Sequence, residues 1–283
     1  MPQIPSEVLS CVGFLSPGEH ETPDGTVFFV SIHADDPDHR GRVSAIYAVT
    51  AKHLLERYEV ESGSDKAWLR LNRRGGGVVS VSTKTEDWRR HPDADVAIHT
   101  WPLEHSFDIT PFPARQHLID DIMVEWNITP GDDVFLSGLF WQHAGQTRNA
   151  PIVRLGSIAA MRGDKIYTTN YGAMDAYLIE VRSVGGLSGS PVFFNGEGRR
   201  KIRVRPIGIG GRQLPSRIER RAETSGFFLL GLVHGHYQAH AMRVDGIEDV
   251  INSGIAIAVP ADKILELILG RQGVDRSRLD NKD

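Results

Sequence analysis

Short apolar runs separated by glycine, proline, aspartate and asparagine make up most of the chain. Valine, isoleucine, phenylalanine and tyrosine are frequent in these runs, and in several of them apolar and polar positions alternate, as in antiparallel strands. Six runs lie in the first half and about seven in the second, at residues 8–15, 25–32, 44–50, 67–71, 78–83 and 95–100, then 133–139, 151–160, 176–182, 190–194, 203–209, 227–237 and 254–259. Helical crossovers are not predicted between them, which favours two barrels or sandwiches over an α/β fold.

Helical patterns are confined to two places. Residues 260–269 carry apolar side chains at helical spacing and are followed by Gly270, which predicts a C-terminal helix. A shorter helix is expected over residues 54–58. The polar, proline-containing stretch 101–130 predicts a link between the halves. We therefore expect one domain over residues 8–115, a second over 130–270, and a flexible charged tail over 271–283.

The composition is that of an ordinary globular protein of 283 residues, with 40% hydrophobic and 24% charged residues. A net charge of −4 argues against a nucleic-acid partner or a membrane surface. Cys11 is the only cysteine, so no intrachain disulfide can form. The N-terminus lacks the pattern of a signal peptide, and no apolar run approaches the roughly 18 residues of a membrane span. The sequence therefore predicts a cytoplasmic protein without membrane contact.

The segment GGLSGSPVF at residues 185–193 has the features of a nucleophile turn. A serine hydroxyl needs a base to take its proton and fixed donors to polarise the reacting carbonyl. The glycines beside Ser188 allow successive N–H groups to converge, so those of Gly186 and Ser188 are the candidate oxyanion donors. Ser190 replaces the last glycine of an α/β-hydrolase elbow, and Pro191 begins a strand rather than a helix. Taken alone, the segment is equally consistent with a glycine-rich turn that has no chemistry.

Two further segments offer the partners that such a serine needs. His53 ends the segment TAKH (50–53), and histidine is the usual general base because its pKa lies near neutrality. Asp95 begins the segment DVAI (95–98), where its carboxylate could orient an imidazole at a barrel edge. Asp93 is a competing choice, but it lies in a polar turn. Each residue alone is a weak signal, because surface histidines and turn aspartates are common.

In the order His53, Asp95, Ser188 these segments resemble the chymotrypsin-like (trypsin-like) serine peptidase family, in particular its bacterial intracellular members. The similarity extends to LLGLVHG (229–235) and NSGIAIAVP (252–260), and it covers roughly residues 8–270. It implies an all-β fold of two six-stranded antiparallel β-barrels with a C-terminal α-helix. His53 and Asp95 would belong to the first barrel and Ser188 to the second.

The resemblance also implies which residues contact a substrate. Val233, His234 and His236 would lie on the strand that flanks the bound peptide, and Arg182 at the floor of the specificity pocket, where it would favour acidic residues. The family position that matches His234 usually carries a small residue bonded to the triad carboxylate. His234 is therefore expected to contact Asp95 and to tune activity with pH. Since His234 and His236 are two residues apart, we expect them on one face of the strand.

No cofactor and no metal are predicted. Together with His240, the histidines of the substrate-flanking strand suggest zinc, but no cysteine or carboxylate near them in the sequence completes a convincing set of ligands.

Control of activity is expected to come from outside the chain. Digestive members of the family carry aspartate at position 187, which pairs with a newly formed N-terminus, and Leu187 cannot make that ion pair. We therefore expect a regulatory protein partner or a ligand to order the loop 184–187. Residues 196–226 hold nine arginine and lysine residues against three glutamates. A solvated hairpin and loop is the simpler interpretation, and a surface for an acidic partner or nucleic acid is the alternative.

The sequence thus predicts a serine endopeptidase that cleaves a protein or peptide substrate by acyl transfer through Ser188, His53 and Asp95. One alternative is a pseudo-protease, in which the same fold serves as a binding or scaffold module. Another is an esterase or other acyl hydrolase that uses the same residues.

Overall fold

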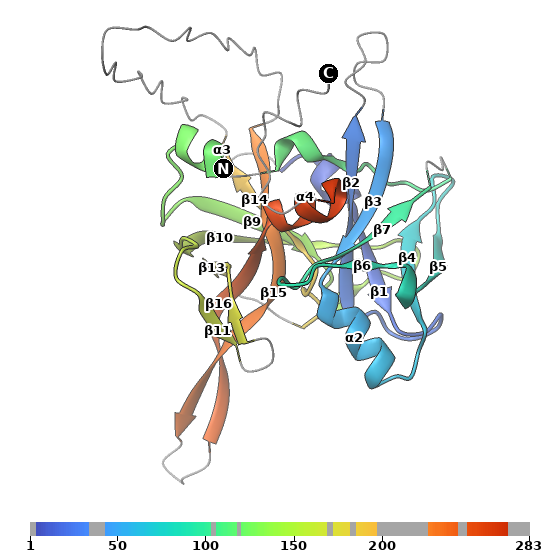
Figure 1. Ribbon diagram of the computed structural model, residues 1–283. Coiled ribbons are helices and arrows are strands. Elements are labelled where there is room, and N and C mark those ends of the chain that lie inside the picture. The colour runs from blue at the N-terminus through green and yellow to red at the C-terminus, as the bar shows by residue number, and fades with distance from the viewer. Residues whose placement is uncertain are drawn as a thin grey trace, which may run out of the picture.

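The computed structural model describes residues 4–33, 43–102, 106–117, 120–168, 172–181, 185–196, 226–242 and 248–270. Each half of the chain forms one large sheet, and the short C-terminal helix lies near the centre of the molecule, in contact with strands of both sheets (Figure 1). In the part of the chain that is described, no helix is long and apolar enough to cross a membrane.

The N-terminal sheet contains the six strands predicted in the first half. They are β1 (Val12–Ser16), β2 (Gly25–His33), β3 (Val43–Thr50), β4 (Lys66–Asn72), β5 (Val78–Lys84) and β7 (Ala97–Trp101). The two-residue strands β6 (Arg89–Arg90) and β8 (Phe112–Pro113) complete the sheet, in the order β5-β4-β1-β2-β3-β7-β6 with β8 parallel to β2. Within the described ranges this order ends at β5 and β6, so the sheet is curled but its ends are not hydrogen-bonded into a ring.

The C-terminal sheet is a closed barrel in the order β10-β13-β16-β15-β14-β9. Its strands correspond to six of the predicted runs: β9 (Asp133–Gly138), β10 (Ile152–Ala160), β13 (Tyr177–Glu180), β14 (Pro191–Asn195), β15 (Phe227–Met242) and β16 (Glu248–Pro260). The remaining predicted run, 203–209, lies outside the described residues, as do most of the basic segment 196–226 and the tail 271–283. The all-β class is confirmed.

Two features of the second half were not predicted. β15 and β16 continue beyond the barrel as a paired ribbon, from Gln238 opposite Asn252 to Met242 opposite Glu248 (Figure 1). A separate hairpin is formed by β11 (Ile166–Thr168) and β12 (Gly172–Met174).

The cores of the two sheets meet. β4 alternates between buried and less buried residues, whereas β2 is buried continuously from Gly25 to Ser31. Between the halves, Phe112 of β8 packs edge-on against Phe193 of β14, with ring centroids 5.0 Å apart. Because β2 lies in the interior, any polar group on it must find a partner there.

Within the described ranges the α-helices are α1 (Ser6–Ser10), α2 (Lys52–Val60), α3 (Asp120–Glu125) and α4 (Ala261–Leu269). α2 and α4 are the predicted helices. The strand predicted from residue 8 is wrong over residues 8–10, where the Ser10 hydroxyl donates to the Ser6 carbonyl and the chain makes a helical turn. α4 buries Ile264 and Leu265, and its buried Glu266 lies 2.8 Å from Nε2 of His91, which joins the C-terminal helix to the first half.

Candidate active site

The three predicted catalytic residues lie at the ends of regular elements. β3 ends at Thr50, and α2 begins at Lys52, so His53 is the second residue of that helix. Asp95 lies in the turn between β6 and β7, and Ser188 lies in the turn that leads into β14. Two of these residues therefore belong to the first half of the chain and one to the second.

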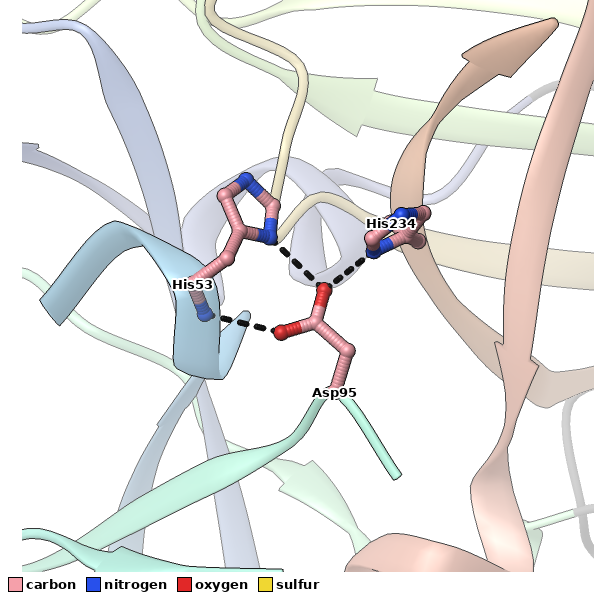
Figure 2. Close-up of side chains that lie close together, drawn as sticks. All are labelled: His53, Asp95 and His234. Atoms are coloured by element: carbon pink, nitrogen blue, oxygen red, sulfur yellow. Dashed lines mark hydrogen bonds and ion pairs between the residues drawn. The ribbon is translucent and has the colours of Figure 1, made fainter. Parts of the chain in front are cut away.

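Asp95 holds His53 through both carboxylate oxygens (Figure 2). Its Oδ1 accepts the backbone N–H of His53 at 2.8 Å, and its Oδ2 lies 2.7 Å from Nδ1 of the imidazole. Because an ionised carboxylate can only accept, Nδ1 of His53 carries the proton of this bond. In the neutral imidazole Nε2 is then the basic nitrogen.

A second imidazole shares the same carboxylate oxygen. Nδ1 of His234 lies 2.5 Å from Oδ2 of Asp95, and the rings of His53 and His234 meet edge to face with centroids 5.3 Å apart (Figure 2). The contact between His234 and Asp95 that the sequence resemblance implied is thus present.

The ionised form of Asp95 is strongly favoured. The Asp95 side chain is fully buried, and its loss of hydration opposes ionisation. The hydrogen bonds and charges of His234 and His53 outweigh this effect and hold the pKa of Asp95 well below its ordinary value. The carboxylate therefore remains charged over the whole physiological pH range.

Ser188 is linked to this cluster through the backbone of His234. The Ser188 hydroxyl donates to the carbonyl oxygen of His234 at 3.1 Å, and the Ser188 carbonyl accepts the backbone N–H of Thr26 at 2.9 Å. His234 consequently binds Asp95 with its side chain and Ser188 with its main chain.

Thr26 of β2 holds the nucleophile turn, and sequence reasoning missed it. Its hydroxyl donates to the Gly186 carbonyl at 2.9 Å, and it accepts the N–H of Leu139 at 3.0 Å and the hydroxyl of Ser190 at 3.1 Å. The Thr26 carbonyl in turn accepts the hydroxyl of Thr50 at 2.7 Å. No local signal marks Thr26, because it is one residue of a continuously buried strand.

The glycines of the turn are required by its geometry. Gly186 and Gly189 have φ angles of +92° and +82°, which other residues rarely adopt. A Cβ atom on Gly189 would also lie 2.2 Å from the carbonyl oxygen of Thr26. Among the described residues, no hydrogen-bond acceptor is found for the N–H groups of Gly186 and Ser188. These two groups are the predicted oxyanion donors.

The other predicted residues are placed differently. The N–H of Val233 donates to the Ser190 carbonyl and its own carbonyl accepts from Gly189, both at 2.8 Å, so Val233 fixes β15 to the turn. His236 is half-buried, and burial lowers its pKa. Arg182 lies outside the described residues.

Regular alternation, on which the expected shared face of His234 and His236 depends, is interrupted at His234. β15 has one more residue than β16 between the pairs Val233–Ala258 and Gly235–Ile257. The additional residue is His234, and such a β-bulge breaks the alternation and redirects a side chain. A single sequence does not show this, because the bulge depends on how β15 pairs with β16.

His53, Asp95 and His234 also form a group whose nitrogen and oxygen atoms lie within 4.8 Å of one another, as metal ligands would. However, the contacts of 2.7 and 2.5 Å from the two Nδ1 atoms to Oδ2 are hydrogen-bond distances. A metal would have to displace both of the shared protons. The set fits a proton-sharing site better than a metal centre.

Comparison with known proteins defines the fold. No protein-family model matches the chain, and no curated protein matches it. The apo protease domain of MamO from Magnetospirillum magneticum has a similar structure, with a TM-score of 0.50 and 14% identity over 94% of this chain and 98% of that one. Deg5 (TM-score 0.47, 13% identity, 94% and 93%) and an inactive form of Rv3671c from M. tuberculosis H37Rv (0.45, 16%, 95% and 91%) are also similar. The two barrel-like sheets and the similarity to the MamO domain show the chymotrypsin-like fold of serine protease domains, as the sequence resemblance implied. Identities this low show the fold alone.

Proposed function

We propose that this protein is a serine endopeptidase, with Ser188 as nucleophile, His53 as general base and Asp95 as the orienting carboxylate. The observation that carries the proposal is the hold of Asp95 on His53, whose Nδ1 and backbone N–H lie 2.7 and 2.8 Å from the two carboxylate oxygens. This hold fixes the imidazole in the tautomer that a general base needs. The site would lie between the two proposed domains, residues 8–115 and 130–270.

In the proposed reaction, the Ser188 hydroxyl leaves the His234 carbonyl and turns toward Nε2 of His53. Hydrogen bonds of this kind often become well aligned only when substrate is bound. His53 takes the proton as Oγ of Ser188 attacks the peptide carbonyl, and it then gives that proton to the departing amine as the C–N bond breaks. Water hydrolyses the acyl-enzyme by the same route, and Asp95 stays ionised throughout.

The negative charge that develops on the substrate oxygen would be held by the N–H groups of Gly186 and Ser188. Support comes from the hydrogen bond by which Thr26 fixes the Gly186 carbonyl at 2.9 Å, since a donor is effective only when its position is fixed beforehand. Val233, His234 and His236 are proposed to flank the peptide substrate.

We further propose that a protein partner or ligand regulates the enzyme through the loop 184–187. Leu187 is 1% exposed, so the position before the nucleophile is occupied by a buried apolar side chain. Leu187 has no carboxylate that could pair with an N-terminus formed by cleavage, so activation must proceed by another route.

A fluorophosphonate probe tests the nucleophile. The wild type should be labelled at Ser188, and Ser188→Ala should abolish labelling and lower kcat on any substrate by about six orders of magnitude. Ser82→Ala is the matched control, because Ser82 is exposed on β5 and its removal should leave labelling unchanged. Cleavage sites found in the host proteome with wild type but not with Ser188→Ala would then distinguish a peptidase from an esterase. Equal labelling of wild type and Ser188→Ala would contradict the assignment.

The direction of the Ser188 hydroxyl favours one alternative, a pseudo-protease that serves as a binding module. The hydroxyl donates to the His234 carbonyl at 3.1 Å, so its proton is engaged by a group other than His53. A protein that remains in this arrangement would not react with the probe in the presence of any partner or peptide. Labelling at Ser188 under any of these conditions rules the alternative out.

A further inference from the structure

His234 occupies an unusual position in the site. It is the additional residue of the bulge in β15, and its side chain reaches Oδ2 of Asp95 at 2.5 Å. A bulge beside a functional site commonly redirects one side chain, and here that side chain is a second titratable imidazole.

The Asp95 carboxylate is consequently divided between two rings. Its Oδ2 accepts from both Nδ1 atoms, at 2.7 Å from His53 and 2.5 Å from His234. One negative charge therefore faces two groups that can each become positive. Because the ring centroids are 5.3 Å apart, protonation of one ring disfavours protonation of the other.

We propose that His234 is a positioning residue that divides the Asp95 carboxylate and thereby lowers the pH at which His53 becomes an effective base. The inference rests on the proposed function in one respect, that His53 is the general base. The quantity that it predicts is the protonation equilibrium of His53, which can be measured without a substrate.

Titratable groups on two other elements face His234. Asp95 faces it from the turn before β7, and His53 faces it from α2. Opposite the bulge, β16 presents the uncharged residues Ala258 and Ile257. On β15 itself the titratable group nearest in the sequence is His236, whose pKa is lowered by burial.

The direction in which the His53 pKa should change follows from the sharing of the Asp95 carboxylate by His53 and His234. An N–H donated by His234 already stabilises the Asp95 charge, which leaves less of that charge to stabilise a protonated His53. If the donor is removed, His53 has the whole carboxylate, and its protonated form is favoured. The pKa of His53 should then rise, and the free base should appear only at higher pH.

The experiment is an NMR titration of the histidine rings in the full-length protein, with His53 assigned by its loss in His53→Gln. His234→Ala should raise the His53 pKa by about one unit, a tenfold change in the protonation equilibrium. His234→Asn should restore a value near the wild type, because its amide can donate from about the position of Nδ1 without titrating. His20→Asn, at an exposed histidine, is the matched control and should change nothing.

An unchanged His53 pKa in His234→Ala, in a variant shown by circular dichroism to be folded, overturns the inference. An equal rise in His234→Ala and His234→Asn also overturns it, because the effect would then follow from lost packing rather than from the donor.

A second readout separates this inference from the proposed function. If the wild type is labelled by the fluorophosphonate, the acidic limb of the labelling rate against pH should move up by about one unit in His234→Ala. Labelling with an unmoved limb leaves the peptidase standing and removes the role of His234. If the His53 pKa shifts in a protein that is never labelled, the role of His234 stands and the proposed peptidase activity is contradicted.

Discussion

Thr26 is a buried residue of β2 whose hydroxyl has three hydrogen-bonding partners, all in the second half of the chain. It donates to the Gly186 carbonyl and accepts from the Leu139 N–H and the Ser190 hydroxyl. A threonine in the N-terminal sheet thus determines the shape of a turn that belongs to the C-terminal barrel.

Replacement of Thr26 by valine should therefore disturb the nucleophile turn. It leaves the Gly186 carbonyl and the Leu139 N–H without their partner, and an unsatisfied buried polar group costs about 1–3 kcal/mol. The free energy of unfolding in urea should fall by about that amount, and the rate of fluorophosphonate labelling should fall about tenfold or more. Thr26→Ser keeps the hydroxyl and is expected to stay close to the wild type in both measurements. A Thr26→Val variant that matches the wild type in both measurements would contradict this role, because valine keeps the methyl group and lacks only the hydroxyl.

Single residues differ in how far the sequence reveals them. His53, Asp95 and Ser188 could be proposed as a triad because each lies in a short segment of characteristic composition, in an order that resembles a known family. Thr26 could not be named, since its bond to Gly186 spans 160 positions and no local pattern records it. For His234 the contact with Asp95 followed from the resemblance, whereas the bulge did not.

At the scale of elements, α4 packs against both halves of the chain, through its contacts with β7 and β15. Leu265 is fully buried, whereas Leu269 on the same helix is 37% exposed. Leu265→Ala should lower the free energy of unfolding by about 2–5 kcal/mol, the usual cost of a large-to-small change in a core. Leu269→Ala is the matched control and should change it by about 0.5 kcal/mol or less. Urea denaturation measures both, and equal effects would mean that α4 does not dock as described.

Strands were predicted well where alternation or continuous burial is strong. The twelve strands that form the main frame of the two sheets, β1–β5, β7, β9, β10 and β13–β16, each match a predicted run. Misses occur where elements are very short or depend on partners, as with the two-residue strands β6 and β8 and the six-residue helix α3. Residues 8–10 were misread because an apolar turn of helix and the start of a strand look alike over so few positions.

At the scale of the whole molecule, stability should depend on pH through His117. Burial lowers the pKa of His117 from its ordinary value of 6.5 to about 3. Between about pH 6.5 and pH 3, His117 binds a proton in the unfolded chain but stays neutral in the folded one. The free energy of unfolding must therefore fall as the pH is lowered through this range. The contribution of one such proton is at most about 1.4 kcal/mol per pH unit.

His117→Leu should make this dependence shallower. Urea denaturation between pH 7 and pH 4.5 measures the slope, and this range lies above the region where carboxylates such as Asp95 dominate. His20→Asn, at an exposed position, should keep the wild-type slope. If His117→Leu also keeps it, the ring of His117 is not buried in its neutral form.

The bond from Thr26 to the Gly186 carbonyl has a consequence for how such a chain can be divided. If the chain is cut between the two sheets, the C-terminal fragment carries Ser188 but lacks the Thr26 hydroxyl that shapes its loop. The N-terminal fragment carries His53 and Asp95 but lacks the serine. On the proposed function, neither piece should turn over substrate by itself, and activity should return only as the pieces reassociate. The split chain would therefore report the meeting of any two proteins fused to its halves.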